Sequence, residues 1–132
     1  YAIRRIVMNL ASNSIRHAQC RSVRISLDCH GENAAWTLFD LQDDGAGIPP
    51  DLLPHLGEPM YLSDPAHRKE FFVKGSGLGF VICRRVVAEH GGRMLVSSAP
   101  GRGVRVRIWL PADLHGPVDD SEFAPLETEV VP

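Results

Sequence analysis

The feature that most restricts the fold of this chain is the order in which helical and strand-like hydrophobic periods follow one another. Residues 1–19 place apolar side chains every three or four positions, which predicts a helix that packs on one side. Residues 23–43 alternate apolar and polar side chains around a turn and predict a hairpin. The same pair of patterns recurs at residues 78–90 and 93–111. Two helix–hairpin units without a β-α-β repeat predict an α/β two-layer sandwich, with a mixed, mostly antiparallel sheet and the helices on one face.

Glycine and proline mark the boundaries of these units. Gly91 and Gly92 follow the second helix, and glycine is the preferred residue just after a helix C-terminus. The four residues 100–103, Pro-Gly-Arg-Gly, predict the turn of the last hairpin. Between the two units, residues 49–56 predict a short helix with proline in its first turn. Residues 57–76 show no period and predict a long loop, and loops of this length are usually functional or disordered.

The charge of the chain is distributed unevenly along its length. The 132 residues suffice for one domain, and a net charge of −2 with 44% apolar residues gives no sign of a nucleic-acid or membrane-surface binder. Residues 112–132 hold six acidic residues and no Lys or Arg, so residues 1–111 carry 14 basic and 10 acidic side chains. We expect the acidic tail to be disordered or to link domains.

Cysteine usage points to a reducing compartment. Cys20, Cys29 and Cys83 form no CxxC pair, so they predict incidental or buried thiols and neither a disulfide framework nor a zinc site. No apolar run approaches the roughly 20 residues of a membrane span, and no signal peptide opens the chain. We expect a cytoplasmic domain without direct membrane contact. The chain starts in the middle of a helix and without Met, so we also expect it to be a piece of a longer protein, either soluble or an inner-membrane sensor.

The first helix carries polar side chains beside its apolar stripe. At 100° per residue Asn9, Asn13 and Arg16 fall within about 60° of one another, at the margin of the core. Amides in such a position need hydrogen-bond partners, and nearby loop backbone is one solution. The other is a ligand: the carbonyl oxygen of Asn13 can bind Mg²⁺, and Arg16, one turn further on, can meet an anion that the metal holds.

The segment DDGAGIPP follows an apolar strand directly. We assign the carboxylate of a D-x-G-x-G pattern here to Asp44, with Gly45 and Gly47. Backed by Ile48, such a carboxylate can accept a hydrogen bond from an exocyclic amine in an apolar slot, and the glycines let a ligand approach closely. The simpler alternative is a tight surface turn, because Asp-Gly turns are common.

The segment GSGLGF spaces three glycines evenly at the start of the second helix. Gly75, Gly77 and Gly79, with Ser76 and Leu78 between them, expose backbone N–H groups at the positive end of a helix, which is a phosphate-binding arrangement. Lys74 precedes the glycines and no GKS or GKT follows, so this is not a Walker A loop. No strand leads into it, so it is not the dinucleotide-binding fingerprint.

Taken in this order, the segments resemble the catalytic ATP-binding domain of sensor histidine kinases, a branch of the GHKL superfamily (Bergerat fold) that includes gyrase, Hsp90 and MutL. NLASNSIRH resembles the N box, DDGAGIP the G1 box and GSGLGF the G2 box. The ending from His90 to Pro111, HGG-x5-S-x-x-G-x-G-x5-WLP, resembles the end of these kinases. The resemblance covers residues 1–111, without the family's first strand.

The resemblance implies ATP and Mg²⁺ as ligands, with residues 57–76 as the ATP lid. Asn13 would bind the metal, Asp44 would read the adenine amine, and Asn13 and Arg16 would form the catalytic pair. His17 would lie beside the ribose, and Lys74 is the lid cation that we favour over Arg68 and Lys69. The implied ATP-binding set is Asn9, Asn13, Arg16, His17, Asp44, Gly45, Gly47, Ile48, Lys74, Gly75, Ser76, Gly77, Leu78 and Gly79.

The resemblance also bears on whether the domain hydrolyses ATP or transfers its γ-phosphate to a histidine. Hydrolysing members of the superfamily carry a Glu base where this chain has Asn9, and an amide takes no proton from water at neutral pH. Transfer to a neutral imidazole needs no such base. The expected activity is therefore transfer of the ATP γ-phosphate to a His on a separate dimerisation domain, which supplies a response regulator in turn. Three alternatives stay open: a degenerate nucleotide-binding or interaction module, an ATP-hydrolysing switch and a purely structural domain. The first is raised by the lid segment LGEPMY, which has Gly57 and Met60 where the family has aromatic residues.

Overall fold

The computed structural model describes residues 1–17, 20–56, 78–112 and 126–131. Along the chain these residues form helix α1 (Ala2–His17), strands β1 (Val23–His30) and β2 (Trp36–Asp43), helix α4 (Leu78–Glu89), and strands β3 (Arg93–Ala99), β4 (Gly103–Pro111) and β5 (Leu126–Val130). Two 3₁₀ turns, η1 (Glu32–Ala34) and η2 (Leu53–His55), complete the described elements. The two predicted helix–hairpin units are therefore confirmed.

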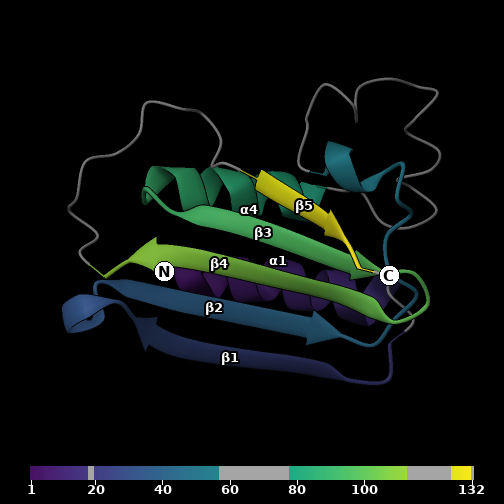
Figure 1. Ribbon diagram of the computed structural model, residues 1–132, viewed down its shortest axis with the longest axis horizontal. Helices are drawn as coiled ribbons and strands as arrows, with labels where there is room; N and C mark the ends of the chain where they lie inside the picture. Colours follow the sequence, from purple (N-terminus) through teal and green to yellow (C-terminus); the bar gives the residue numbers. More distant parts are fainter. Residues whose placement is uncertain (18–19, 57–77, 113–125, 132) are drawn as a thin grey trace.

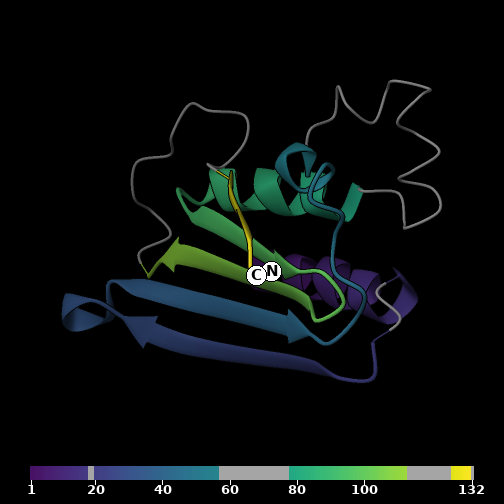
Figure 2. The same ribbon diagram turned by 45° about the vertical axis from the view of Figure 1, so that its right-hand side comes forward.

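The strands form one sheet in the order β1-β2-β4-β3-β5 (Figure 1). The hairpins β1-β2 and β3-β4 are antiparallel, as is the β2-β4 pair that joins them. Strand β5 runs parallel to β3 and makes the sheet mixed. Both helices lie on the same face of the sheet, side by side (Figures 1 and 2). This is the predicted two-layer α/β sandwich.

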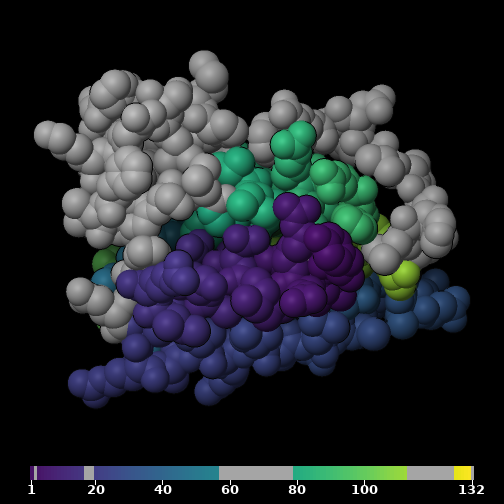
Figure 3. All heavy atoms as spheres, turned by 180° about the vertical axis from the view of Figure 1, so that it is seen from behind, coloured from purple at the N-terminus to yellow at the C-terminus, as the bar shows by residue number. Residues whose placement is uncertain are grey.

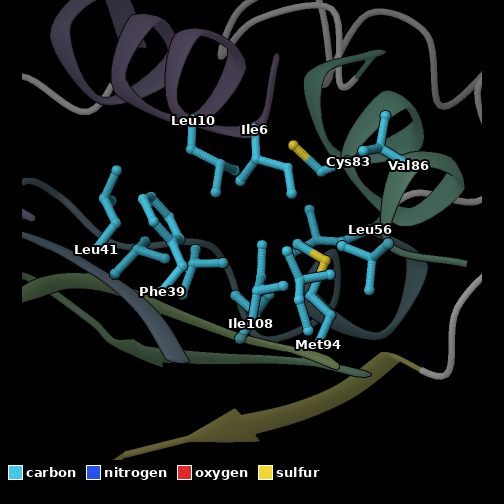
Figure 4. Packing of buried hydrophobic residues seen from close by; sticks show 14 of the residues in the cluster. Ile6, Leu10, Phe39, Leu41, Leu56, Cys83, Val86, Met94 and Ile108 are labelled. Carbon is cyan, nitrogen blue, oxygen red and sulfur yellow. The ribbon is translucent and has the colours of Figure 1, made fainter. Parts of the chain in front are cut away.

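The core lies between the two helices and the sheet. Strand alternation points Phe39 and Leu41 of β2 toward the helices, where they meet Ile6 and Leu10 of α1 (Figure 4). Each of these four side chains is at most 2% exposed, and full burial of such a group contributes about 1.5–3 kcal/mol. Cys83 of α4 lies in the same cluster, where burial raises the pKa of its thiol to about 12. It is the buried thiol that the sequence predicts, whereas Cys29 is exposed.

The C-terminus of α4 is fixed by the two glycines predicted to end it. Gly91 has a φ of 67°, its N–H donates to the carbonyl of Ala88, and the N–H of Gly92 donates to the carbonyl of Val87 at 2.9 Å. This pair of bonds is the Schellman motif. Gly92 also lies close to β4, since a Cβ there would be 2.5 Å from the carbonyl oxygen of Trp109.

Two expectations are corrected by the structure. Residues 49–56 form a turn followed by the 3₁₀ turn η2 and no α-helix, because Pro54 has no N–H for the helical bond. The tail is not disordered over its described part, because residues 126–130 are the strand β5. The exposed backbone edge of β3 pairs with it, and composition gives no signal for that pairing. Within the described residues no helix is long and apolar enough to span a membrane.

Candidate functional site

The polar face of α1 meets the first turn of α4. Gly79 packs so closely against Asn13 that a Cβ on the glycine would run into the Asn13 amide. The N box and the last glycine of the G2 box are therefore in contact across the two helices. Figure 3 shows α1 on the surface of the molecule between α4 and the strand β1. Asn13 thus lies beside the positive end of α4, where an anion would bind.

The three polar residues of the α1 face have different surroundings. Asn9 is half-buried, and its amide donates to the carbonyl of Arg5 in its own helix at 2.8 Å. Arg16 is exposed. Asn13 is half-buried, and among the described residues no hydrogen bond engages its amide. The helix backbone therefore satisfies Asn9, and within the described residues no loop backbone engages the Asn13 amide, which can face a ligand there. The backbone of His17 ends α1, and its side chain lies outside the described residues.

The structure moves the candidate amine-reading carboxylate from Asp44 to Asp43. Asp44 is exposed, and its carboxylate accepts hydrogen bonds from the N–H groups of Arg21 and Ser22 at 2.8 and 2.9 Å. These bonds, from Ser22 first and Arg21 second, lower the pKa of the Asp44 carboxyl below its ordinary 3.8. Asp44 therefore caps a surface turn, and its neighbour Asp43 becomes the stronger candidate for the adenine contact.

Asp43 is the residue that satisfies both the spacing and the geometry. It stands two residues before Gly45, as D-x-G-x-G requires, and it follows Phe39 and Leu41 on the helix-facing side of β2. Its carboxylate, 5% exposed, accepts from the Ser14 hydroxyl at 2.9 Å and from the Gly45 N–H at 3.0 Å.

A third bond to Asp43 comes from β4. The N–H of Val104 donates to the carboxylate at 3.1 Å. Gly103, at a φ of 103°, leaves room for this approach, because a Cβ there would run into the Asp43 backbone. Asp43 is thus held from α1, from the G1 loop and from β4, which fixes its orientation.

The G1 loop is fastened to the end of β3. The Ser98 hydroxyl accepts from the Ile48 N–H at 2.8 Å and donates to the Ile48 carbonyl at 3.2 Å. Gly47, at a φ of 81°, lies so near that a Cβ would be 2.8 Å from the Ala99 carbonyl oxygen. The Ile48 side chain packs on the core, so it backs the site as predicted. Gly45 and Gly47 therefore serve close packing within the protein as well as room for a ligand.

Part of the predicted site lies outside the described residues. This holds for Lys74, Gly75, Ser76, Gly77 and the lid at 57–76; of Leu78 only the backbone is described. Sequence reasoning missed Ser14, Asp43 and Ser98. Strict motif spacing would have found Asp43, and the S-x-x-G-x-G ending already contains Ser98. Ser14 gave a weaker signal, as a small polar residue within an apolar stripe.

The donor set fits a magnesium ion that is shared with a ligand. Among the described residues no group of three His, Cys, Asp or Glu side chains could hold a metal alone. The side-chain carbonyl oxygen of Asn13, which accepts no hydrogen bond from the described residues, is a single neutral oxygen ligand beside the start of α4. Mg²⁺ commonly binds through one or two protein oxygens together with substrate phosphates, so these residues fit it.

A depression of about 390 Å³ lies elsewhere, lined by His30, Trp36, Arg93 and Trp109. Trp36 pairs with His30 at the end of the β1-β2 ladder opposite to Asp43, and strand alternation points it to the helix-free face. Arg93 at its rim is already ion-paired with Glu127 at 2.7 Å. This depression is separate from the converging motifs.

The chain matches a known protein family and several sensor kinases in sequence. Residues 1–114 match the family described as histidine kinase-, DNA gyrase B-, and HSP90-like ATPases. The chain is 32% identical over 110 residues to histidine protein kinase DivJ of Caulobacter vibrioides, covering 83% of this chain and 18% of DivJ. It is 35% identical over 111 residues to sensor protein KdpD of Escherichia coli, covering 81% of this chain and 11% of KdpD.

The fold has a counterpart among solved structures. The crystal structure of full-length ShkA in complex with AMPPNP superposes with a TM-score of 0.60 at 22% identity, covering 94% of this chain and 22% of ShkA. The chain thus spans less than a quarter of the length of each of these three proteins.

Proposed function

Because the chain belongs to the family of histidine kinase-, DNA gyrase B- and HSP90-like ATPases, we propose that it is the ATP-binding catalytic domain of a two-component sensor histidine kinase. In this role it transfers the ATP γ-phosphate to a His on a separate dimerisation domain of the parent protein, which then supplies a response regulator. The observation that carries the proposal is the convergence of Asn13, the start of α4 and the Asp43-bearing end of β2 on one side of the sheet.

The adenine end of the site is built around Asp43. Its carboxylate is fixed by Ser14, Gly45 and Val104, so it can accept the adenine amine without reorganising. Ile48 of the same loop packs on the core and supplies an apolar wall. At the position of the adenine amine, guanine presents a carbonyl oxygen, which cannot donate to this carboxylate. The site therefore favours adenine over guanine.

The phosphate end of the site lies between α1 and α4. The N–H groups of the first turn of α4, with those of Gly75, Gly77 and Gly79, hold the phosphates at the positive end of the helix. Arg16 and Lys74 supply positive charge, and Asn13 provides one oxygen to Mg²⁺. When bound, Mg²⁺ neutralises charge that develops on the γ-phosphoryl group. The protein's part in catalysis is then positioning and charge stabilisation.

The residue at position 9 favours transfer of the ATP γ-phosphate to a histidine over hydrolysis of ATP by water. The Asn9 amide is engaged with the Arg5 carbonyl and has no proton-accepting function at neutral pH. Water bound near the γ-phosphate therefore finds no general base at position 9. The isolated domain is expected to bind ATP without hydrolysing it.

A calorimetric titration of the chain with AMPPNP, in the presence and absence of Mg²⁺, tests the proposal. One-site binding that tightens with Mg²⁺ supports it, and no binding refutes it. Supplying a dimerisation domain with its His and radiolabelled ATP then tests transfer. Nucleotide binding without transfer would favour the degenerate module that the lid sequence LGEPMY raises.

A further inference from the structure

Ser14 brings a hydroxyl group into the buried stripe of α1. It follows Ile6 and Leu10 at intervals of four residues and is 4% exposed. Leu10, one turn earlier, lies in the same cluster as Leu41 of β2 (Figure 4). A buried hydroxyl needs a partner, and a helical serine often finds it in a carbonyl of its own preceding turn. Ser14 instead donates to the carboxylate of Asp43, 29 residues away, at 2.9 Å.

The backbone on both sides of this contact is held in place. The half-buried thiol of Cys20 donates to the carbonyl of Ser14 at 3.1 Å. At the end of β2, Asp44 accepts hydrogen bonds from the N–H groups of residues 21–22, just beyond α1. The end of α1 and the end of β2 are therefore tied together beside the bond from Ser14 to Asp43.

The two oxygens of the Asp43 carboxylate differ in what they accept. Oδ1 accepts from the N–H of Gly45 at 3.0 Å and from the N–H of Val104 at 3.1 Å. Oδ2 accepts from the Ser14 hydroxyl, and among the described residues no other donor reaches it. Each oxygen of a carboxylate offers two acceptor positions. Oδ1 is therefore filled, and Asp43 has a single acceptor position left, on Oδ2.

A single acceptor position restricts the bases that this carboxylate can recognise. One N–H of the 6-amino group of adenine is enough to fill it. Guanine can offer a carboxylate two parallel donors, N1–H and N2–H, but such a pair needs both oxygens open. Oδ1 of Asp43 is closed to it by Gly45 and Val104. The hydrogen bonds to Asp43 thus also disfavour guanine when it is turned to present these donors.

We propose that Ser14 is a specificity-determining residue, which positions the Asp43 carboxylate so that Oδ2 accepts one N–H of a 6-aminopurine. The proposal rests on the proposed function and adds to it the residue that sets the selectivity. Ser14 occupies one position on Oδ2, fixes the plane of the carboxylate and keeps water from the occupied position. The remaining position then points in one direction only.

Two nucleotides that differ only in the 6-amino group test the role of Ser14: ADP and purine riboside 5′-diphosphate. Their Kd values are measured by calorimetry with Mg²⁺ for the wild-type chain and for Ser14→Ala. We expect the wild type to prefer ADP by about tenfold or more, as for one hydrogen bond to a charged group. Ser14→Ala should reduce this preference about fivefold, because water can take the vacated position and the carboxylate can turn. Binding of the analogue should change by less than about twofold.

Ser98→Ala is the matched control. It removes a second buried hydroxyl, which is 1% exposed and bonds to the backbone of Ile48 and not to Asp43. It should change the Kd of both nucleotides by the same factor and leave the preference for ADP as it is in the wild type. If Ser14→Ala also changes both Kd values equally, Ser14 only supports the fold and the proposal is overturned.

Ser14→Cys separates the hydrogen bond from packing and serves as a second variant if Ser14→Ala does not fold. Its thiol fills a similar volume but is a weaker donor, so we expect a preference between those of the wild type and Ser14→Ala. A full wild-type preference in Ser14→Cys would assign the effect to volume and overturn the proposal. A wild-type chain that binds neither nucleotide would refute the proposed function itself, whereas equal effects on both nucleotides would refute only the role of Ser14.

Discussion

At the scale of single residues, Asp43 and Asp44 show how strand alternation separates two chemically identical neighbours. Asp43 follows the helix-facing side of β2 and is buried under α1, with all of its described donors coming from protein groups. Asp44 points outward and caps the turn at residues 21–22. The sequence pattern predicted a carboxylate at this place. To choose between Asp43 and Asp44, one must know which of them points toward the helices. Alternation along the strand tells this only when the residue at which the strand ends is known.

Replacing Asp43 with Asn is expected to weaken ATP binding while leaving the fold intact. The Asn oxygen can still accept from Gly45 and Val104, and its amide can donate to the Ser14 hydroxyl. Its amide also presents a donor to the adenine amine, which costs about 1–3 kcal/mol of binding, roughly fivefold to 150-fold in Kd. Calorimetry with AMPPNP measures this, and Asp44→Asn is the matched control. A larger effect at residue 44 than at residue 43 would reverse the assignment.

The Asp44 cap predicts a specific pH dependence of stability. Because the folded-state pKa lies below the ordinary 3.8, the ionised carboxylate stabilises the native state at pH values above 3.8. That contribution is lost as the pH falls below 3.8 through the folded-state pKa. The melting temperature of the wild type should therefore exceed that of Asp44→Asn at pH 7, and the difference should shrink toward zero in acid. A difference that grows on acidification would contradict the cap.

At the scale of elements, the contact between α1 and α4 joins two motifs that lie 66 residues apart, from Asn13 to Gly79. Gly79→Ala improves helix propensity by up to about 1 kcal/mol but pushes the Asn13 amide aside. We expect unchanged or slightly higher stability with roughly tenfold weaker Mg-AMPPNP binding, since a displacement near 1 Å can cost that much. Calorimetry and thermal unfolding separate the two effects.

A double-mutant cycle controls this experiment. In the Asn13→Ala background the clash is removed, so Gly79→Ala should no longer weaken binding. A loss of the same size in both backgrounds would mean that Gly79 acts through the helix terminus and not through Asn13.

The glycines that end α4 and β3 should differ in their tolerance to alanine. At Gly101 a Cβ meets nothing within 4 Å, so only the φ of 74° opposes it, which costs about 1–2 kcal/mol. At Gly92 a Cβ would be 2.5 Å from the Trp109 carbonyl oxygen and 2.9 Å from Val87. Overpacking of this kind typically costs about 1–3 kcal/mol, so Gly92→Ala is expected to lose more stability than Gly101→Ala in chemical denaturation. The reverse order would show that β4 can shift away from α4.

The elements that the sequence predicted well are those with a strong local period. Both helices and both hairpins carry such a period, and the glycine pair at residues 91–92 ends α4 where expected. Strand β5 carries no such signal: LETEV is short and acidic, and its pairing partner is the open edge of β3. That pairing depends on tertiary context, which overrides composition.

At the scale of the whole molecule, the order of helical and strand-like segments was enough to predict the two-layer sandwich. The contacts that hold the site rigid were not predictable in the same way. Ser14 and Val104 each donate one hydrogen bond to Asp43, and Ser98 makes two to Ile48, in each case to a residue distant in sequence. Such hydrogen bonds produce no periodic pattern in the amino-acid sequence. They become visible only when the sheet register brings Asp43 beside Val104 and Ile48 beside Ser98.

Because the two helices and the sheet each contribute to one site, nucleotide binding should stabilise the domain as a unit. A ligand at 100 times its Kd adds about 2.7 kcal/mol to the free energy of unfolding, which for a domain of this size raises Tm by roughly 10 °C. We expect this shift with Mg-AMPPNP in the wild type. Asn13→Ala should keep the native melting temperature without ligand and lose the part of the shift that depends on Mg²⁺. A Mg²⁺-dependent shift that survives in Asn13→Ala would place the metal on another residue.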